Sequence, residues 1–85
     1  MNSITFEKLA LEHLEDWSKV DLKAVKKIIE LINDIRKHPF EGIGKPEPLK
    51  HEFKGCWSRR ISQEHRLIYR VKSETIEILS CKGHY

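Results

Sequence analysis

Three kinds of side chain that can act together on a phosphate occur in the second half of this sequence. Glu47 stands between two prolines, arginines occur at Arg60 and Arg66, and the last two positions are His84 and Tyr85. A carboxylate can take a proton and an imidazole can give one near neutral pH. A guanidinium adds a fork of donors that matches phosphate oxygens. These residue types predict acid and base chemistry at a phosphodiester.

RNA cleavage is the reaction that fits this set. It needs a base for the ribose 2′-hydroxyl, cations for the phosphorane and an acid for the departing 5′-oxygen. We assign the base role to Glu47, because its prolines restrict the backbone and Lys45 and Lys50 lie close enough in sequence to keep it ionised. Arg66 and Arg60 are the expected phosphate partners, and Lys50 adds a further charge. We expect neither a metal nor a cofactor.

The C-terminal residues supply the candidate acid. A terminal carboxylate beside His84 would favour the protonated imidazole, and Tyr85 could hydrogen-bond the phosphate or stack on a base. We rank His51 and His65 below His84, because each could equally be a surface imidazole.

Each assignment has a structural alternative. Glu47 could be a solvated loop carboxylate, and the chain end could be a frayed tail. Arg60 and Arg66 could instead pair across strands with Glu77 or Glu52.

Two helices should precede these residues. Residues 3–6 are predicted to form a short strand, and a helix follows from Glu7 with Ala10, Leu14 and Trp17 on one face. Asp21 is the expected cap of a second helix that ends before Pro39. Its apolar stripe is expected to face the core and comprises Leu22, Val25, Ile28, Ile29, Ile32 and Ile35.

The second half should form a loop and then a sheet. Residues 39–55 hold three glycines and three prolines in addition to polar residues, which predicts a long loop. Residues 56–61, 66–71 and 75–79 have strand character and are joined by connections short enough for hairpins. The expected fold is therefore α+β, with two N-terminal helices on one face of an antiparallel sheet.

Strand alternation sorts the side chains between the two faces of that sheet. The face under the helices should take the apolar residues of the first two strands, namely Trp57, Ile61, Leu67, Tyr69 and Val71. The open face should then display Ser58, Arg60, Arg66, Ile68 and Arg70. Arg59 has the opposite parity to Arg60, so we expect a structural or partner contact for it.

Length and charge set broader limits. The 85 residues are expected to form a single domain, residues 1–85, with a net charge of +3. The charge is −2 over residues 1–35 and +5 over residues 36–85, a weak sign of polyanion binding. No run of residues indicates a membrane span or a secretory signal, so we expect a cytoplasmic protein. Cys56 and Cys81 fit neither a zinc spacing nor a redox pair, and free thiols are expected.

Four ordered motifs carry a resemblance to a known family. They are K-P-E-P-L-K-H at 45–51, G-x-W-S-R-R-I at 55–61, E-H-R-L-x-Y at 64–69 and G-H-Y at 83–85, with F-E-G at 40–42 before them. The chain resembles the YoeB (Txe) toxins of bacterial toxin-antitoxin modules, within the RelE-like superfamily. The resemblance implies a RelE-like microbial RNase fold and a ribosome-dependent mRNA interferase that cuts the message in the decoding site.

The resemblance also implies roles for particular residues. Glu47 matches the family's general base, Arg66 its phosphate stabiliser, His84 its general acid and Tyr85 a tail residue that helps to fix the substrate. Lys50 and Arg60 match basic positions near the same site. A YefM-like antitoxin is the implied partner, and a homodimer is compatible with the family.

Two other functions compete with this one. The first is a non-enzymatic toxin of the ParE type that binds a protein such as DNA gyrase. The second is a small RNA-binding module without chemistry. Neither would need a base and an acid around a cluster of arginines.

Overall fold

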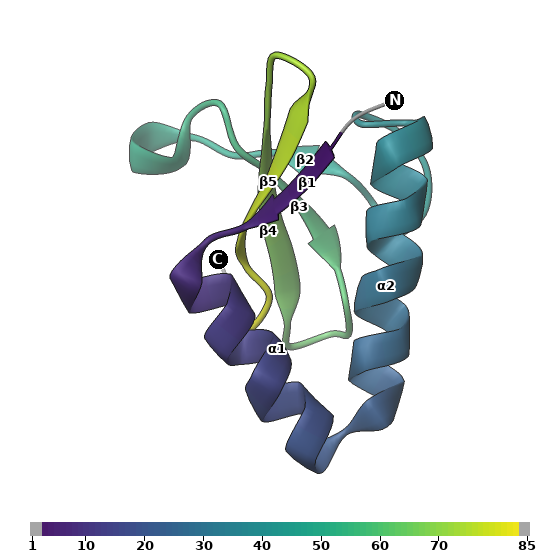
Figure 1. Ribbon diagram of the computed structural model, residues 1–85. Helices are drawn as coiled ribbons and strands as arrows, with labels where there is room; N and C mark the ends of the chain where they lie inside the picture. The colour runs from purple at the N-terminus through teal and green to yellow at the C-terminus, as the bar shows by residue number, and fades with distance from the viewer. Residues whose placement is uncertain (1–2, 84–85) are drawn as a thin grey trace.

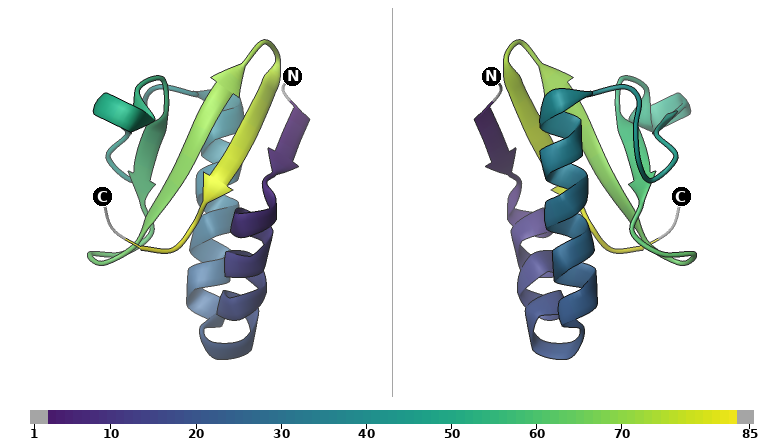
Figure 2. Two further views of the ribbon diagram at one scale, coloured as in Figure 1. Left: turned by 90° about the vertical axis from the view of Figure 1, so that its left-hand side faces the viewer. Right: turned by 90° about the vertical axis from the view of Figure 1, so that its right-hand side faces the viewer.

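Two helices and a five-stranded sheet make up residues 3–83, the part of the chain that the computed structural model describes. The elements, in chain order, are β1 (Ser3–Phe6), α1 (Lys8–Val20), α2 (Leu22–Lys37), β2 (Glu47–Pro48), the short 3-10 helix η1 (His51–Phe53), β3 (Trp57–Arg60), β4 (Arg66–Lys72) and β5 (Thr75–Ser80). Figure 1 shows how they are arranged. In Figure 2, α2 lies behind the sheet in one view and in front of it in the other, so it covers one face of the sheet, and Ala10 and Trp17 of α1 are buried in the core on that side.

The strands are arranged in the order β1-β5-β4-β3-β2. The pairs β3–β4 and β4–β5 are antiparallel, as expected, and β2, which the sequence did not predict, is antiparallel to β3. β1 instead runs parallel to β5, so the sheet is mixed rather than wholly antiparallel. Short hairpins fix the direction of consecutive strands. Both helices and three further strands separate β1 from its partner, so no local connection sets its direction.

The buried face of α1 and the start of α2 both follow from the local sequence. In α1, Ala10 and Trp17 are buried and Leu14 packs partly buried against the same core, which confirms the expected face. The Asp21 carboxylate accepts hydrogen bonds from the main-chain N–H groups of Lys23 and Ala24 at the start of α2. Asp21 is thus the helix cap that the sequence predicted.

The apolar stripe of α2 is narrower than expected. Ile28, Leu31 and Ile35 are fully buried, whereas Ile29 is 52% exposed and Leu22 is 65% exposed. These positions are three and four residues apart and so follow one side of a helix, whereas Ile29 is turned about 100° away from Ile28. The expectation was therefore wrong for Leu22 and Ile29, and it omitted Leu31.

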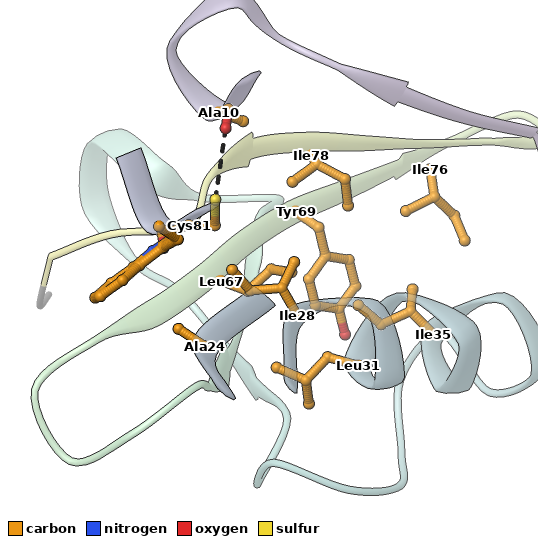
Figure 3. Packing of buried hydrophobic residues seen from close by; sticks show 11 residues of the cluster. Ala10, Ala24, Ile28, Leu31, Ile35, Leu67, Tyr69, Ile76, Ile78 and Cys81 are labelled. Carbon is orange, nitrogen blue, oxygen red and sulfur yellow. Dashed lines mark hydrogen bonds between the residues drawn. The ribbon is translucent and has the colours of Figure 1, made fainter. Parts of the chain in front are cut away.

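The core lies between α2, α1 and the covered face of the sheet. Leu67 and Tyr69 of β4 are fully buried against the helices, as Figure 3 shows. Val71, Trp57 and Ile61 pack partly buried around the same cluster, which confirms the predicted covered face. Ser58 and Ile68 were expected to be displayed on the open face, but they are 6% and 1% exposed, so that expectation was wrong for these two residues. The side chains that β5 adds to this core are Ile76 and Ile78.

Both cysteines are free and buried, as expected. Burial raises the pKa of the Cys81 thiol to about 11, so it is protonated and unreactive at neutral pH. Its Sγ lies 3.5 Å from the carbonyl oxygen of Ala10, inside the core (Figure 3). In the described part of the chain, neither helix is long and apolar enough to cross a membrane.

Candidate active site on the open face of the sheet

Glu47 lies on the sheet and not in an irregular loop. It pairs with Ser58 across the β2–β3 ladder and is exposed to solvent. Pro48 is tolerated there because β2 is an edge strand. Lys45 and His51, on either side of this segment, have positive φ angles of 52° and 58°, which are uncommon outside glycine. The prediction of a loop over residues 39–55 therefore missed the strand that fixes the candidate base.

A buried arginine holds the segment that leads into β2. Arg59 is fully buried and donates to the Asp34 carboxylate and to the Tyr69 hydroxyl. Its guanidinium also donates to three main-chain carbonyls of the loop, those of His38, Glu41 and Ile43. The hydrogen bond from Arg59 lowers the pKa of Asp34 below its ordinary value of 3.8. The structural role expected for Arg59 is confirmed.

Two glycines allow this loop to approach the core. A Cβ on Gly42 would lie 2.0 Å from Asp34 Oδ2, and one on Gly44 would lie 2.7 Å from Leu31 Cδ2. Both residues also have positive φ. Because the Gly44 carbonyl accepts the Arg60 N–H at 2.7 Å, the loop is tied directly to β3 just before Glu47. Larger residues at these positions would displace the strand that carries Glu47.

Arg60 and Arg66 face each other on the open face. They are Cα partners in the β3–β4 ladder, and Arg60 is exposed. Like charges directly opposite each other are destabilising, so a bound anion would relieve a real cost. Within residues 3–83 neither arginine makes an ion pair with a carboxylate. The alternative of pairing with Glu77 or Glu52 is wrong, because Glu77 binds Arg70, at 2.6 Å.

Arg66 is fixed at one end of its guanidinium. Nη1 donates to the main-chain carbonyls of the β3–β4 turn, at 2.8 Å from Ser62, 3.1 Å from Gln63 and 3.2 Å from His65. Nε and Nη2 make no hydrogen bond to any other described residue. These two nitrogens form the side-on edge that binds two oxygens of a phosphate. The turn therefore orients the arginine and leaves its binding edge available.

The sheet brings the candidate base and the two arginines to one region. Glu47 is opposite Ser58, and Arg60 is the next same-face residue along β3. Ordinary sheet spacings put the Cα atoms of Glu47 and Arg60 about 8 Å apart. Lys50 is exposed and lies in the two-residue link between β2 and η1. No ion pair joins Glu47 to Lys45 or Lys50 within the described part of the chain.

His84 and Tyr85 lie outside the described residues, but the residue before them is placed. The Arg66 N–H donates to the Gly83 carbonyl at 2.9 Å, so Gly83 lies beside β4 at the position of Arg66. His65 also contacts Gly83, a role that sequence reasoning missed because no spacing motif marks it. Among residues 3–83, no group of three or more His, Cys, Asp or Glu side chains could hold a metal ion.

Known proteins share this sequence and this fold. Residues 6–85 match the family described as YoeB-like toxin of bacterial type II toxin-antitoxin system. Toxin YoeB of Escherichia coli strain K12 is 56% identical over 69 residues, which are 81% of this chain and 82% of that protein. These likenesses confirm the expected family.

Solved structures of relatives have the same fold. A YoeB dimer from Staphylococcus aureus has a TM-score of 0.92 at 48% identity and covers 99% of this chain and 98% of its own. A YoeB-YefM complex from the same organism has a TM-score of 0.90 at 46% identity and covers 100% of this chain and 99% of its own. The α+β fold implied by the resemblance is thus confirmed.

Proposed function

Because the chain belongs to the YoeB-like toxins of bacterial type II toxin-antitoxin systems, we propose that it is an endoribonuclease that cuts mRNA in the decoding site of the ribosome. One observation carries the proposal. An exposed carboxylate, Glu47, shares a sheet face with two arginines, Arg60 and Arg66, that oppose each other without a carboxylate partner among residues 3–83. A site with charges in this arrangement is suited to an anionic substrate that must lose a proton.

The proposed reaction is an internal transfer at phosphorus. Glu47 removes the proton of the ribose 2′-hydroxyl, and the 2′-oxygen forms a bond to the adjacent phosphorus. The bond from phosphorus to the 5′-oxygen breaks, and His84 supplies a proton to that oxygen. The products are a 2′,3′-cyclic phosphate and a 5′-hydroxyl. Each proton has one donor and one acceptor in this scheme, so the side chains account for the whole step.

The cations act on the charge that develops at phosphorus. Arg66 is the main stabiliser in this proposal, because its Nη1 is held by the turn and its Nε and Nη2 edge can take two phosphate oxygens. Arg60, opposite it, adds a second positive charge, and Lys50 adds a point charge beside β2. Tyr85 would help to fix the substrate, by a hydrogen bond or by stacking.

The ribosome would supply what this small site lacks. A shallow site with one candidate base and a few cations cannot hold a flexible RNA in line for attack, whereas a message that is already restrained needs no further ordering. The net charge of +3 would favour approach to ribosomal RNA, and binding should weaken with added salt.

We also propose a YefM-like antitoxin as the partner that neutralises the toxin, in line with the YoeB-YefM complex from S. aureus. A homodimer is proposed for the free chain, in line with the YoeB dimer from that organism. The two helices offer exposed apolar side chains for such contacts, namely Leu9, Leu11, Val20, Leu22 and Ile29. Light scattering on the free chain and on its mixture with the antitoxin would test both assemblies.

The proposed activity is tested by induction in cells followed by primer extension. The wild-type chain should stop translation and create new message ends within codons. A Glu47→Ala, His84→Ala double variant should create none. If the wild type stops growth without new ends, the nuclease proposal is wrong and a ParE-like protein target becomes the better explanation. If the double variant is as toxic as the wild type, RNA binding without chemistry explains the effect better.

A further inference from the structure

Gly83, the residue before the proposed acid, is held through both of its main-chain polar groups. Its N–H donates to Nδ1 of His65 at 3.0 Å, and its carbonyl accepts from the N–H of Arg66 at 2.9 Å. The two partners are consecutive residues, His65 as the last residue of the β3–β4 turn and Arg66 as the first residue of β4. One of them also supplies the guanidinium of the candidate site. Gly83 belongs to the tail, the residues that follow β5. This part of the tail is therefore fixed relative to the proposed phosphate site.

The His65 ring is itself held in place. Its ring centroid is 4.8 Å from that of Trp17, and the two planes meet at 85°, which is the edge-on contact that aromatic pairs favour. Trp17 also donates from Nε1 to the Cys81 carbonyl at 2.8 Å. Trp17 therefore contacts both the tail and the imidazole that holds it, so the ring is fixed on the side of α1.

A second imidazole acts in the same way two residues earlier. The Cys81 N–H donates to Nδ1 of His13 at 3.2 Å, and the Lys82 ammonium lies 3.6 Å from the Asp16 carboxylate. Because both imidazoles accept at Nδ1, each carries its proton on Nε2 and is neutral when the contact forms. Side chains of α1 and of the β3–β4 turn thus hold residues 81–83, which follow the end of β5.

The backbone conformation of Gly83 depends on these hydrogen bonds. Its φ is +100°, and a Cβ there would meet no atom within 4 Å, so crowding does not set its conformation. Glycine has little preference of its own between negative and positive φ. The two hydrogen bonds therefore hold Gly83 in this conformation.

We propose that His65 is a positioning residue for the reaction: by accepting the Gly83 N–H it fixes the point from which the chain continues to His84. This inference rests on the proposed function, because it assigns His65 an effect that is exerted through the general acid. His65 does not contact the reacting atoms in this proposal. Misplacing a catalytic group by about 1 Å can cost about a hundredfold in rate.

Two substitutions at His65 distinguish the effect of its hydrogen-bond acceptor from the effect of its aromatic ring. His65→Phe keeps an aromatic ring against Trp17 and removes the acceptor. His65→Asn removes the ring but places an oxygen on Cγ, where Nδ1 is attached in histidine. His38→Phe is the matched control, because His38 is exposed and its ring makes no hydrogen bond to any other described residue.

The kinetic test is single-turnover cleavage of a message on programmed ribosomes at increasing concentrations of the toxin. His65→Phe should lower the maximal rate about a hundredfold without changing the half-saturating concentration, because substrate binding is intact. His65→Asn should recover most of that rate, and His38→Phe should match the wild type. A wild-type rate in His65→Phe, or a rate in His65→Asn as low as in His65→Phe, would overturn the proposal.

Hydrogen exchange of the Gly83 amide tests the contact itself in the free protein, without ribosomes. Exchange should be slow in the wild type and His65→Asn and fast in His65→Phe. Equal exchange in all three proteins would refute the contact. A wild-type protein that leaves the message uncut would refute the proposed function instead, and the exchange result would still show whether His65 holds the tail.

Discussion

Arg59 and Arg60 are consecutive residues of β3, yet their surroundings are opposite. Arg59 points under the helices, is fully buried and has hydrogen-bond partners for its guanidinium in the Asp34 carboxylate, the Tyr69 hydroxyl and three carbonyls. Arg60 points to the open face, is exposed and stands opposite another arginine, Arg66. Strand alternation alone separates the two environments.

The difference indicates two uses of the same side chain. On the covered face Asp34 neutralises the charge, and three further contacts hold the loop that leads into β2, so the arginine serves the fold. On the open face two guanidinium groups face each other, and the repulsion between them would be relieved by a bound anion. Within residues 3–83 neither arginine pairs with a carboxylate, and two such cations side by side mark a surface that gains by binding an anion. Substitutions on both faces of the sheet test this difference.

The largest effect should come from Glu47→Gln. The amide cannot take the proton of the 2′-hydroxyl, so cleavage on programmed ribosomes should fall about a thousandfold. Stability should change by less than about 0.5 kcal/mol, because Glu47 is exposed. Glu74→Gln, in the exposed β4–β5 turn, is the control and should cut normally. Equal loss of activity in both variants would remove the case for a base at Glu47.

The next effect concerns stability. Arg59→Met should destabilise the fold by about 3 kcal/mol, because it leaves Asp34 and the loop carbonyls without their partner. This is the lower end for a broken buried pair, since the Asp34 side chain is 23% exposed. Arg60→Met should stay within about 0.5 kcal/mol of the wild type. Denaturant unfolding compares them, and similar losses would contradict the division between the two faces.

A smaller effect should follow Arg66→Lys, which keeps the charge but loses the fork. Cleavage should fall about a hundredfold, the size of effect seen when one donor to a developing oxyanion is lost. Arg70→Lys provides the comparison, because Arg70 is on the same strand and face but is already paired with Glu77 at 2.6 Å. That variant should keep most of its activity. Near-normal cleavage by Arg66→Lys would reduce Arg66 to a general electrostatic role.

The smallest effect should be the contribution of His13 to the pH dependence of the stability of the fold. Burial, followed by the nearby Lys82 charge, lowers the pKa of His13 in the fold below its ordinary value of 6.5. As pH falls through 6.5 the unfolded chain binds the proton first, so the stability that neutral His13 contributes is complete above that pH and declines below it. His13→Asn should unfold in urea with a weaker pH dependence than the wild type. An unchanged pH dependence would show that His13 does not contribute.

Much of the fold could be predicted because local pattern decides it. The spacing of Ala10, Leu14 and Trp17 fixed the face of α1, the Asp21 cap fixed the start of α2, and alternation placed Arg60 and Arg66 on one face of the sheet. Each of these features depends on neighbours within one element or one hairpin. The same reasoning was wrong for Ile29. This residue is apolar, but it does not lie on the buried side of α2.

The remaining features depend on contacts between distant residues. The β2 strand exists because Glu47 and Pro48 meet β3, and the Arg59 network depends on Asp34 from another element. The contact of His65 with Gly83 joins a turn to the tail. No residue type or spacing marks such contacts, because they follow from the assembled fold. The roles of His84 and Tyr85 remain predictions, since both residues lie outside the described part of the chain.

The most direct test of the central claim, that the open face performs acid and base chemistry at a phosphodiester, uses purified toxin and ribosomes programmed with one defined message. The same message is prepared with a single 2′-deoxy nucleotide on the 5′ side of the cleaved phosphate. We expect the all-ribose message to be cut to a 2′,3′-cyclic phosphate and a 5′-hydroxyl. We expect the deoxy message to stay intact. Cleavage of the deoxy message at the same position, or a product with a 5′-phosphate, would contradict it.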